Sequence, residues 1–134
     1  KLPAKDVTVA LDACFSGAGG RSVIAKGARP LVNVAKAAPA AANTLILSAS
    51  TAEQISTSHN DGRHGLMTYY LLKGLRGEAD SNKDGKITTS ELFGYVRPSV
   101  EREARLQNIE QTPTLNPAPE ALGRRGEQAW ILTK

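Results

Sequence analysis

The feature that most limits the possible folds is a short apolar run at residues 7–11 (VTVAL), which is followed at once by a polar, glycine-rich turn. Valine and threonine favour strands, and a near-continuous apolar run of this length is typical of a buried parallel strand. The segment Asp12-Ala13-Cys14-Phe15-Ser16-Gly17 comes directly after it. Because open α/β sheets place their functional residues beyond the carboxyl ends of strands, the only cysteine of the chain occupies a candidate site.

The rest of the chain alternates between strand-like and helix-like segments, which predicts an α/β fold. The expected elements are strands at 7–11 and 44–49, helices at 65–76 and 89–106, and a last strand at 128–132. Gly77 is placed to end the first helix, and Pro98 is expected to kink the second or to limit its first segment. With 134 residues the chain is long enough for one domain with a sizeable core.

Composition excludes several classes of function. The net charge is only +4 and the basic residues are scattered, so no nucleic-acid partner is expected. No apolar run approaches the roughly 20 residues that span a bilayer, so no membrane partner is expected either. A single cysteine excludes an internal disulfide and is typical of a reducing compartment, which predicts a cytoplasmic location.

The neighbours of Cys14 favour a nucleophile over a buried structural residue. A lone cysteine is usually a small apolar side chain inside a core. Here, however, a carboxylate lies two residues before the thiol and a glycine lies three residues after it. Small residues at positions 16–20 would let backbone amides approach a bound carbonyl closely. This combination suits a cysteine whose thiolate attacks a carbonyl carbon.

Three blocks of sequence, taken in order, resemble the caspase-like cysteine peptidases, in particular their bacterial and metacaspase branch. They are the cysteine segment 12–17, the strand and loop 47–54 that wall the specificity pocket, and the helix 64–75 that opens the small subunit. The resemblance covers residues 7–113. It implies a caspase-like three-layer sandwich with a mainly parallel sheet flanked by helices, and a cysteine endopeptidase that acts on polypeptides.

The resemblance also divides the chain into parts. Residues 1–17 would hold the nucleophile strand and loop, and residues 44–134 would form the part that is similar to a small subunit. Residues 18–43 lie where the family carries the connection between its subunits, and a linker is the simplest interpretation. A sharper alternative is self-cleavage after one of the basic residues of this segment, which are Arg21, Lys26, Arg29 and Lys36.

Two carboxylates and a serine are the candidates for recognising the substrate. Alternation along an extended chain points Asp12 and Cys14 to the same face. The resemblance places Asp12, Glu53 and Ser48 in the wall of the substrate pocket. Two carboxylates there favour Arg or Lys on the N-terminal side of the scissile bond. The alternatives are a structural hydrogen-bonding role for Asp12 and a solvated loop charge for Glu53.

The catalytic histidine of caspase-like enzymes lies upstream of the cysteine, in a His-Gly pair about 50 residues earlier. No histidine precedes Cys14 in this chain. The pair His64-Gly65 follows Cys14, at the start of a predicted helix. Because the family's catalytic histidine precedes the cysteine along the chain, His64 is not expected to be the base. His59 is expected in a loop. The chain is therefore predicted to be the C-terminal part of a larger domain, whose N-terminal segment would supply the histidine. Without that segment the chain would be a poor catalyst. A non-catalytic caspase-like interaction module is the alternative.

A second motif, at residues 80–91, matches a calcium-binding EF-hand loop. The oxygen ligands would be the side chains of Asp80, Asn82, Asp84 and Glu91 and the backbone carbonyl of Lys86. The turn glycine would be Gly85. The competing interpretation is local structure, because residues 88–91 form a capping box and residues 84–85 form a turn. A calcium-binding regulatory domain, with Cys14 incidental, is thus a further alternative.

Overall fold

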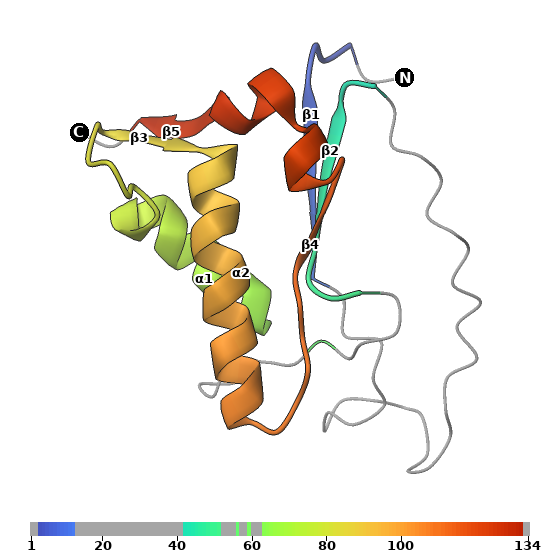
Figure 1. Cartoon of the computed structure of the whole chain (residues 1–134), viewed down its shortest axis with the longest axis vertical. Coiled ribbons are helices and arrows are strands. Elements are labelled where there is room, and N and C mark those ends of the chain that lie inside the picture. The colour runs from blue at the N-terminus through green and yellow to red at the C-terminus, as the bar shows by residue number, and fades with distance from the viewer. Residues whose placement is uncertain (1–2, 13–41, 52–55, 57–58, 60–62, 133–134) are drawn as a thin grey trace.

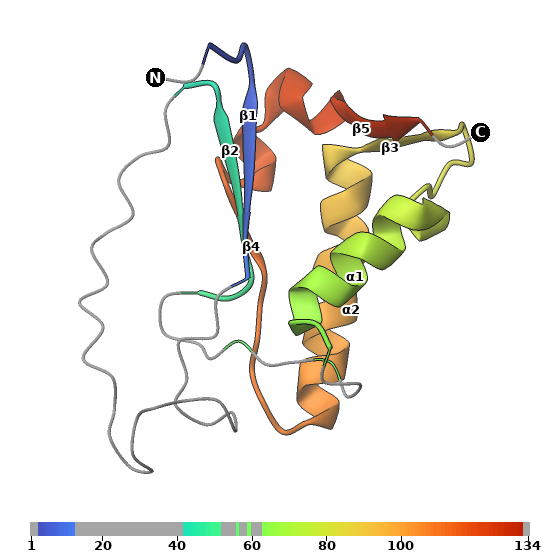
Figure 2. The same cartoon turned by 180° about the vertical axis from the view of Figure 1, so that it is seen from behind.

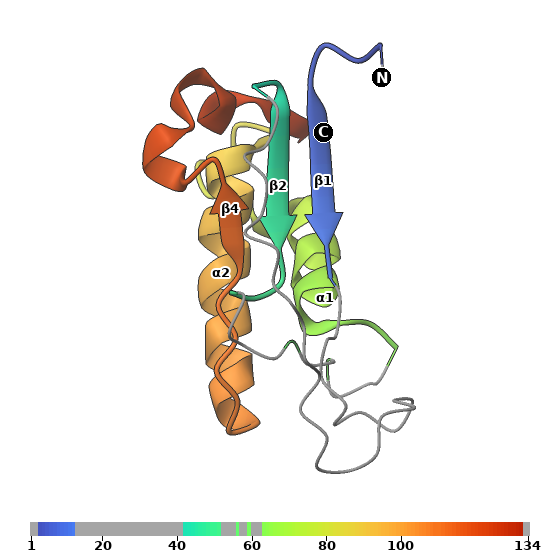
Figure 3. The ribbon, with the colours of Figure 1, turned by 90° about the vertical axis from the view of Figure 1, so that its right-hand side faces the viewer.

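The main sheet contains strands that were predicted and one that was not. A computed structural model describes residues 3–12, 42–51, 56, 59 and 63–132. In it, β1 (Val7–Leu11) pairs in parallel with β2 (Thr44–Ser48), and β2 pairs antiparallel with β4 (Thr114–Asn116). Figure 3 shows the three strands side by side in the order β1-β2-β4. The α/β class is confirmed, and within the described part the sheet is mixed.

Both long helices cover the same face of this sheet, as Figures 1 and 2 show from opposite sides. They are α1 (Leu66–Lys73) and α2 (Thr89–Leu106), and α2 has the predicted bounds. A π-helical turn, Gly74–Glu78, continues α1. Gly77 has φ of 127° within this turn, a value that glycine adopts without strain, so the predicted helix end is confirmed at this position.

The core lies between the sheet and the two helices. A stripe of apolar residues on α2 faces inward, and the inward positions of β2 and β4 face it. The buried apolar side chains of these four elements are Leu45, Leu47, Leu66, Met67, Tyr70, Leu92, Phe93, Val96, Val100, Ala104 and Leu115. By contrast, β1 is poorly covered in the described part: Leu11 is 49% exposed.

Pro98 does not divide α2, which runs as one helix through it. A proline removes one hydrogen bond to the carbonyl four residues earlier, which here belongs to Gly94. Both residues are exposed, so water can satisfy that carbonyl. The hydroxyl of Ser99 donates to the carbonyl of Tyr95, four residues earlier, at 2.7 Å.

The last strand forms a separate, two-stranded sheet. β5 (Ala129–Leu132) pairs antiparallel with β3 (Lys86–Thr88), a short strand that leads into α2. The indole N–H of Trp130 donates to the hydroxyl of Thr89 at 2.9 Å and ties this sheet to the start of α2. None of the helices in the described ranges is long and apolar enough to cross a membrane.

Candidate active site

The carboxyl ends of the two parallel strands meet at the edge of the sheet where α1 begins. Asp12 follows β1 directly. The pairing continues past β2, because the N–H of Ala49 donates to the carbonyl of Leu11 at 2.9 Å. Asp12 lies close enough to α1 to accept a hydrogen bond from its first turn. This edge is therefore where the fold presents functional groups.

The carboxylate of Asp12 caps α1 from 56 residues away. Its Oδ2 atom accepts the backbone N–H of Thr68 at 2.8 Å and the Thr68 hydroxyl at 2.5 Å. This N–H is one of the first-turn donors that have no partner within a helix. The positive end of the helix dipole also favours a negative charge there. The predicted structural role of Asp12 is thus present, and it places a charged group at the edge of the sheet.

Gly65 makes room for this carboxylate. It occupies the N-cap position of α1, where it offers no side-chain hydrogen bond. A Cβ atom at Gly65 would overlap the Asp12 carboxylate and lie only 2.6 Å from its Cγ. Neither Gly65 nor Thr68 is among the predicted site residues. The sequence feature that could have indicated them is the start of a helix without a capping side chain. The N–H groups of an uncapped first turn need an acceptor from elsewhere in the chain.

The second carboxylate oxygen of Asp12 differs from the first. Oδ1 is buried, and among the described residues no group forms a hydrogen bond with it. A buried charged acceptor without a partner is costly unless a donor or cation reaches it. The site therefore holds one carboxylate oxygen that is fixed and another that can still accept a hydrogen bond.

The structure does not bring Ser48 beside Asp12. Leu47 points into the core that the helices cover, so the alternation of β2 turns Ser48 to the opposite face. Asp12 reaches α1 on the helix-covered face.

Beyond β2, Gln111 is only 1% exposed, and its Nε2 atom donates to the carbonyl of Ala49 at 3.0 Å. Gln111 thereby anchors the start of the segment in which Glu53 was predicted to line the pocket.

The remaining predicted residues of the active site divide into two groups. Cys14, Glu53 and most of the segment 18–43 lie outside the described residues. Both histidines are described: His64 is exposed, and its carbonyl accepts the N–H of His59 at 3.0 Å. The ring of His59 stacks on Tyr69, with 3.6 Å between ring centroids. His59 therefore packs on the surface of α1, consistent with its predicted place in a loop.

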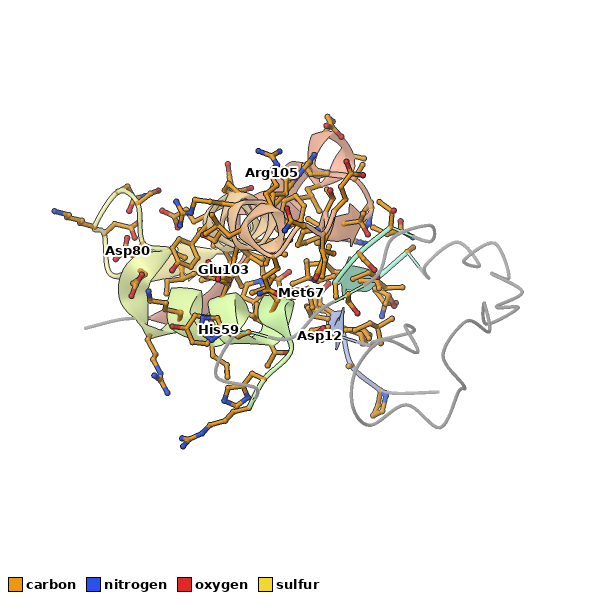
Figure 4. All side chains as sticks on the ribbon, turned by 90° about the horizontal axis from the view of Figure 1, so that it is seen from below. Asp12, His59, Met67, Asp80, Glu103 and Arg105 are labelled. Atoms are coloured by element: carbon orange, nitrogen blue, oxygen red, sulfur yellow. The ribbon has the colours of Figure 1, made fainter. Side chains whose placement is uncertain are left out.

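The predicted calcium loop has the turn structure that its sequence requires. Asp80 accepts the N–H groups of Asp84 at 3.2 Å and Gly85 at 3.1 Å. Asn82 accepts the N–H of Asp84 at 2.9 Å, and Asp84 accepts that of Lys86 at 2.8 Å. The loop lies at the far end of α1 from Asp12, as Figure 4 shows. These side-chain oxygens all bind backbone donors of the loop itself.

Glu91 belongs to the capping box of α2, as the local interpretation predicted. Its Oε2 atom accepts the N–H of Thr88 at 3.0 Å, and its Oε1 atom accepts the Ser81 hydroxyl at 3.2 Å. The hydrogen bond from the Thr88 N–H lowers the pKa of Glu91 below its usual value. Within the described part of the chain, no three acidic, histidine or cysteine side chains converge as a metal site. Bidentate calcium binding would require Glu91 to leave the box.

Comparison with protein families identifies the chain. The sequence model of the family described as "Caspase domain" matches residues 1–120 of the 134. Comparisons with curated proteins and with solved structures gave no match. The matched region contains the main sheet, both long helices and the edge that holds Asp12. Caspase domains are cysteine peptidases, hydrolases whose substrates are polypeptides, and this chain belongs to the caspase-domain family.

Proposed function

We propose that the protein is a cysteine endopeptidase that cleaves peptide bonds after Arg or Lys. Cys14 would be the nucleophile and Asp12 the carboxylate that recognises the basic side chain. The observation that carries this proposal is the state of Asp12, whose Oδ2 is held by Thr68 while its buried Oδ1 has no partner in the described part of the chain. A guanidinium or ammonium group would stabilise such a charge by a short, charge-assisted hydrogen bond.

The chemistry follows from a thiolate two residues beyond that carboxylate. Once a basic side chain is held at Asp12, the Sγ atom of Cys14 would add to the adjacent carbonyl carbon, with the Cys14 backbone N–H donating to the oxyanion. A histidine of the proposed N-terminal segment would take the thiol proton of Cys14 and give it to the amine as the C–N bond breaks. Water hydrolyses the resulting thioester, which releases the new carboxyl terminus and restores the thiol.

An N-terminal caspase-like segment would supply the histidine that acts as the base. Two features of β1 support a further partner for this strand. In the described part, β1 pairs only with β2 and leaves its other edge open. The register aligns Val9 with Ile46 and Leu11 with Ser48, on the face of the sheet away from the described helices. Open edges and apolar sheet faces are normally covered in native proteins.

The recognition role of Asp12 predicts a loss that depends on substrate charge. In the full-length protein, Asp12→Asn should lower kcat/KM for a peptide with Arg before the cleaved bond by about 10²-fold, because the cation loses its buried charged partner. The same peptide with citrulline, a neutral analogue of Arg, should change little. Hydrolysis of the two fluorogenic peptides measures the difference.

Asp6→Asn is the matched control, because Asp6 is an exposed carboxylate before the same strand. It should leave both rates as in the wild type. Equal losses for the Arg and citrulline peptides in Asp12→Asn would refute the recognition role. No hydrolysis of either peptide by the wild-type protein, with the histidine-bearing segment present, would instead support the non-catalytic caspase-like module.

Calcium binding by residues 80–91 stays a prediction, separate from the peptidase site. The oxygen atoms of Asp80, Asn82 and Asp84 sit on one tight turn, and Lys83 and Gly85 have φ of 57° and 80°. Each of these oxygens keeps a second lone pair for the ion, while bidentate coordination by Glu91 would draw it away from Thr88. If it binds, it would act on the start of α2 and regulate the domain.

Calorimetric titration tests the calcium prediction directly. The wild-type protein should bind one Ca²⁺, and Asp84→Ala should abolish the heat of binding because it removes a central oxygen ligand. Glu120→Ala removes an exposed carboxylate outside the loop and should leave binding unchanged. A titration of the wild-type protein without heat would refute calcium binding and leave residues 88–91 as a capping box alone.

A further inference from the structure

Thr68 is the residue that fixes the direction of the Asp12 carboxylate. It lies in the first turn of α1 and donates both its N–H, at 2.8 Å, and its hydroxyl, at 2.5 Å, to the same oxygen, Oδ2. Two donors on one oxygen restrict rotation of the carboxylate more than one donor would. They also leave Oδ1 as the atom without a partner among the described residues.

The backbone of Gly65 limits the carboxylate on a further side. A Cβ atom there would lie 2.6 Å from Cγ and 2.8 Å from Oδ1 of Asp12, so the carboxylate packs directly against the glycine. Gly65 has φ of −57° and ψ of 150°, which most residues adopt readily. The glycine is therefore needed for close approach and not for its backbone conformation. Together, Gly65 and Thr68 hold Asp12 in one orientation before any substrate arrives.

We propose that Thr68 is a positioning residue for the recognition of basic side chains, and this rests on the proposed function of Asp12. Thr68 need not touch the substrate: it acts by holding Oδ2, so that Oδ1 accepts from the guanidinium or ammonium group. Preorganised charged acceptors bind more tightly because the orientation cost is met during folding. The hydroxyl contributes to selectivity for a cationic side chain, and the backbone N–H would remain after any substitution.

The test removes only the hydroxyl. Thr68→Val keeps the shape and the backbone N–H, and should lower kcat/KM for the Arg peptide about tenfold, mainly through KM, as expected for loss of one hydrogen bond to a charged group. The citrulline peptide should change less than twofold, which makes it an internal control for folding. Thr68→Ser restores a hydroxyl and should recover most of the preference for Arg. Equal losses for both peptides, or a Thr68→Ser variant as poor as Thr68→Val, would overturn the positioning role.

A binding measurement separates this proposal from the peptidase mechanism. In a Cys14→Ala background, calorimetry with the uncleaved Arg and citrulline peptides should show preferential binding of the Arg peptide, and Thr68→Val should weaken that preference about tenfold. This outcome would sustain the positioning role even if Cys14 proved not to be the nucleophile. Equal binding of both peptides before any change at Thr68 would overturn the positioning role.

Discussion

Cys14→Ala is expected to lower the rate of peptide hydrolysis by about 10⁴-fold or more in the full-length protein. Removal of the sulfur leaves no nucleophile to form the thioester, while the carboxylate of Asp12 and the backbone donors remain. Binding of Arg peptides should therefore persist when hydrolysis is lost. Hydrolysis of a fluorogenic Arg peptide measures the rate, and calorimetry with the uncleaved peptide measures binding.

The matched control for this change is Thr8→Ala, at an exposed position of the strand that leads to the cysteine. It should hydrolyse the peptide at the wild-type rate. A Cys14→Ala protein that still cleaves within tenfold of the wild type would contradict the nucleophile assignment. The single cysteine would then be a structural residue, as most lone cysteines are.

Gly65→Ala is expected to cost about 1–3 kcal/mol of unfolding free energy, as overpacking of a tight contact usually does. The added Cβ would overlap the Asp12 carboxylate and force it, or the start of α1, to move. Because Oδ2 would then lose its two bonds from Thr68, the preference for Arg over citrulline should fall with stability. Chemical denaturation and the two fluorogenic peptides measure these effects.

Gly94→Ala provides the control for the general effect of replacing glycine by alanine. Gly94 is an exposed residue of α2, and a Cβ there would meet nothing within 4 Å. Alanine should stabilise the helix at this position by up to about 1 kcal/mol. The two substitutions are therefore predicted to have opposite signs. A Gly65→Ala variant as stable and as selective as the wild type would show that the contact with Asp12 is not tight.

Many of the helices and strands could be predicted from the sequence because their patterns are local. The apolar run of β1 and the apolar stripe of α2 predicted those elements within one residue, and the capping box marked where α2 begins. β4 was not predicted, because three residues are too few to show alternation. Its place beside β2 depends on contacts between residues 66 to 70 positions apart, from Ser48 and Thr114 to Ile46 and Asn116.

The site was predictable only in part, for the same reason. Asp12 could be chosen because it stands two residues before the cysteine in a recognisable segment. Thr68 could not, because threonine in the first turn of a helix is unremarkable until a distant carboxylate is placed on it. Gly65 was noticed only as part of a His-Gly pair, whereas in the structure its lack of a side chain admits Asp12.

Cys14 is expected to react with substrates that present a basic side chain. The most direct test treats the full-length protein with a peptidyl-arginine probe carrying a thiol-reactive group, followed by intact mass and mapping of the modified residue. We expect one adduct, on Cys14, that an excess of Arg peptide prevents and that a peptidyl-aspartate probe does not form. Absence of an adduct, or equal labelling by the two probes, would contradict it.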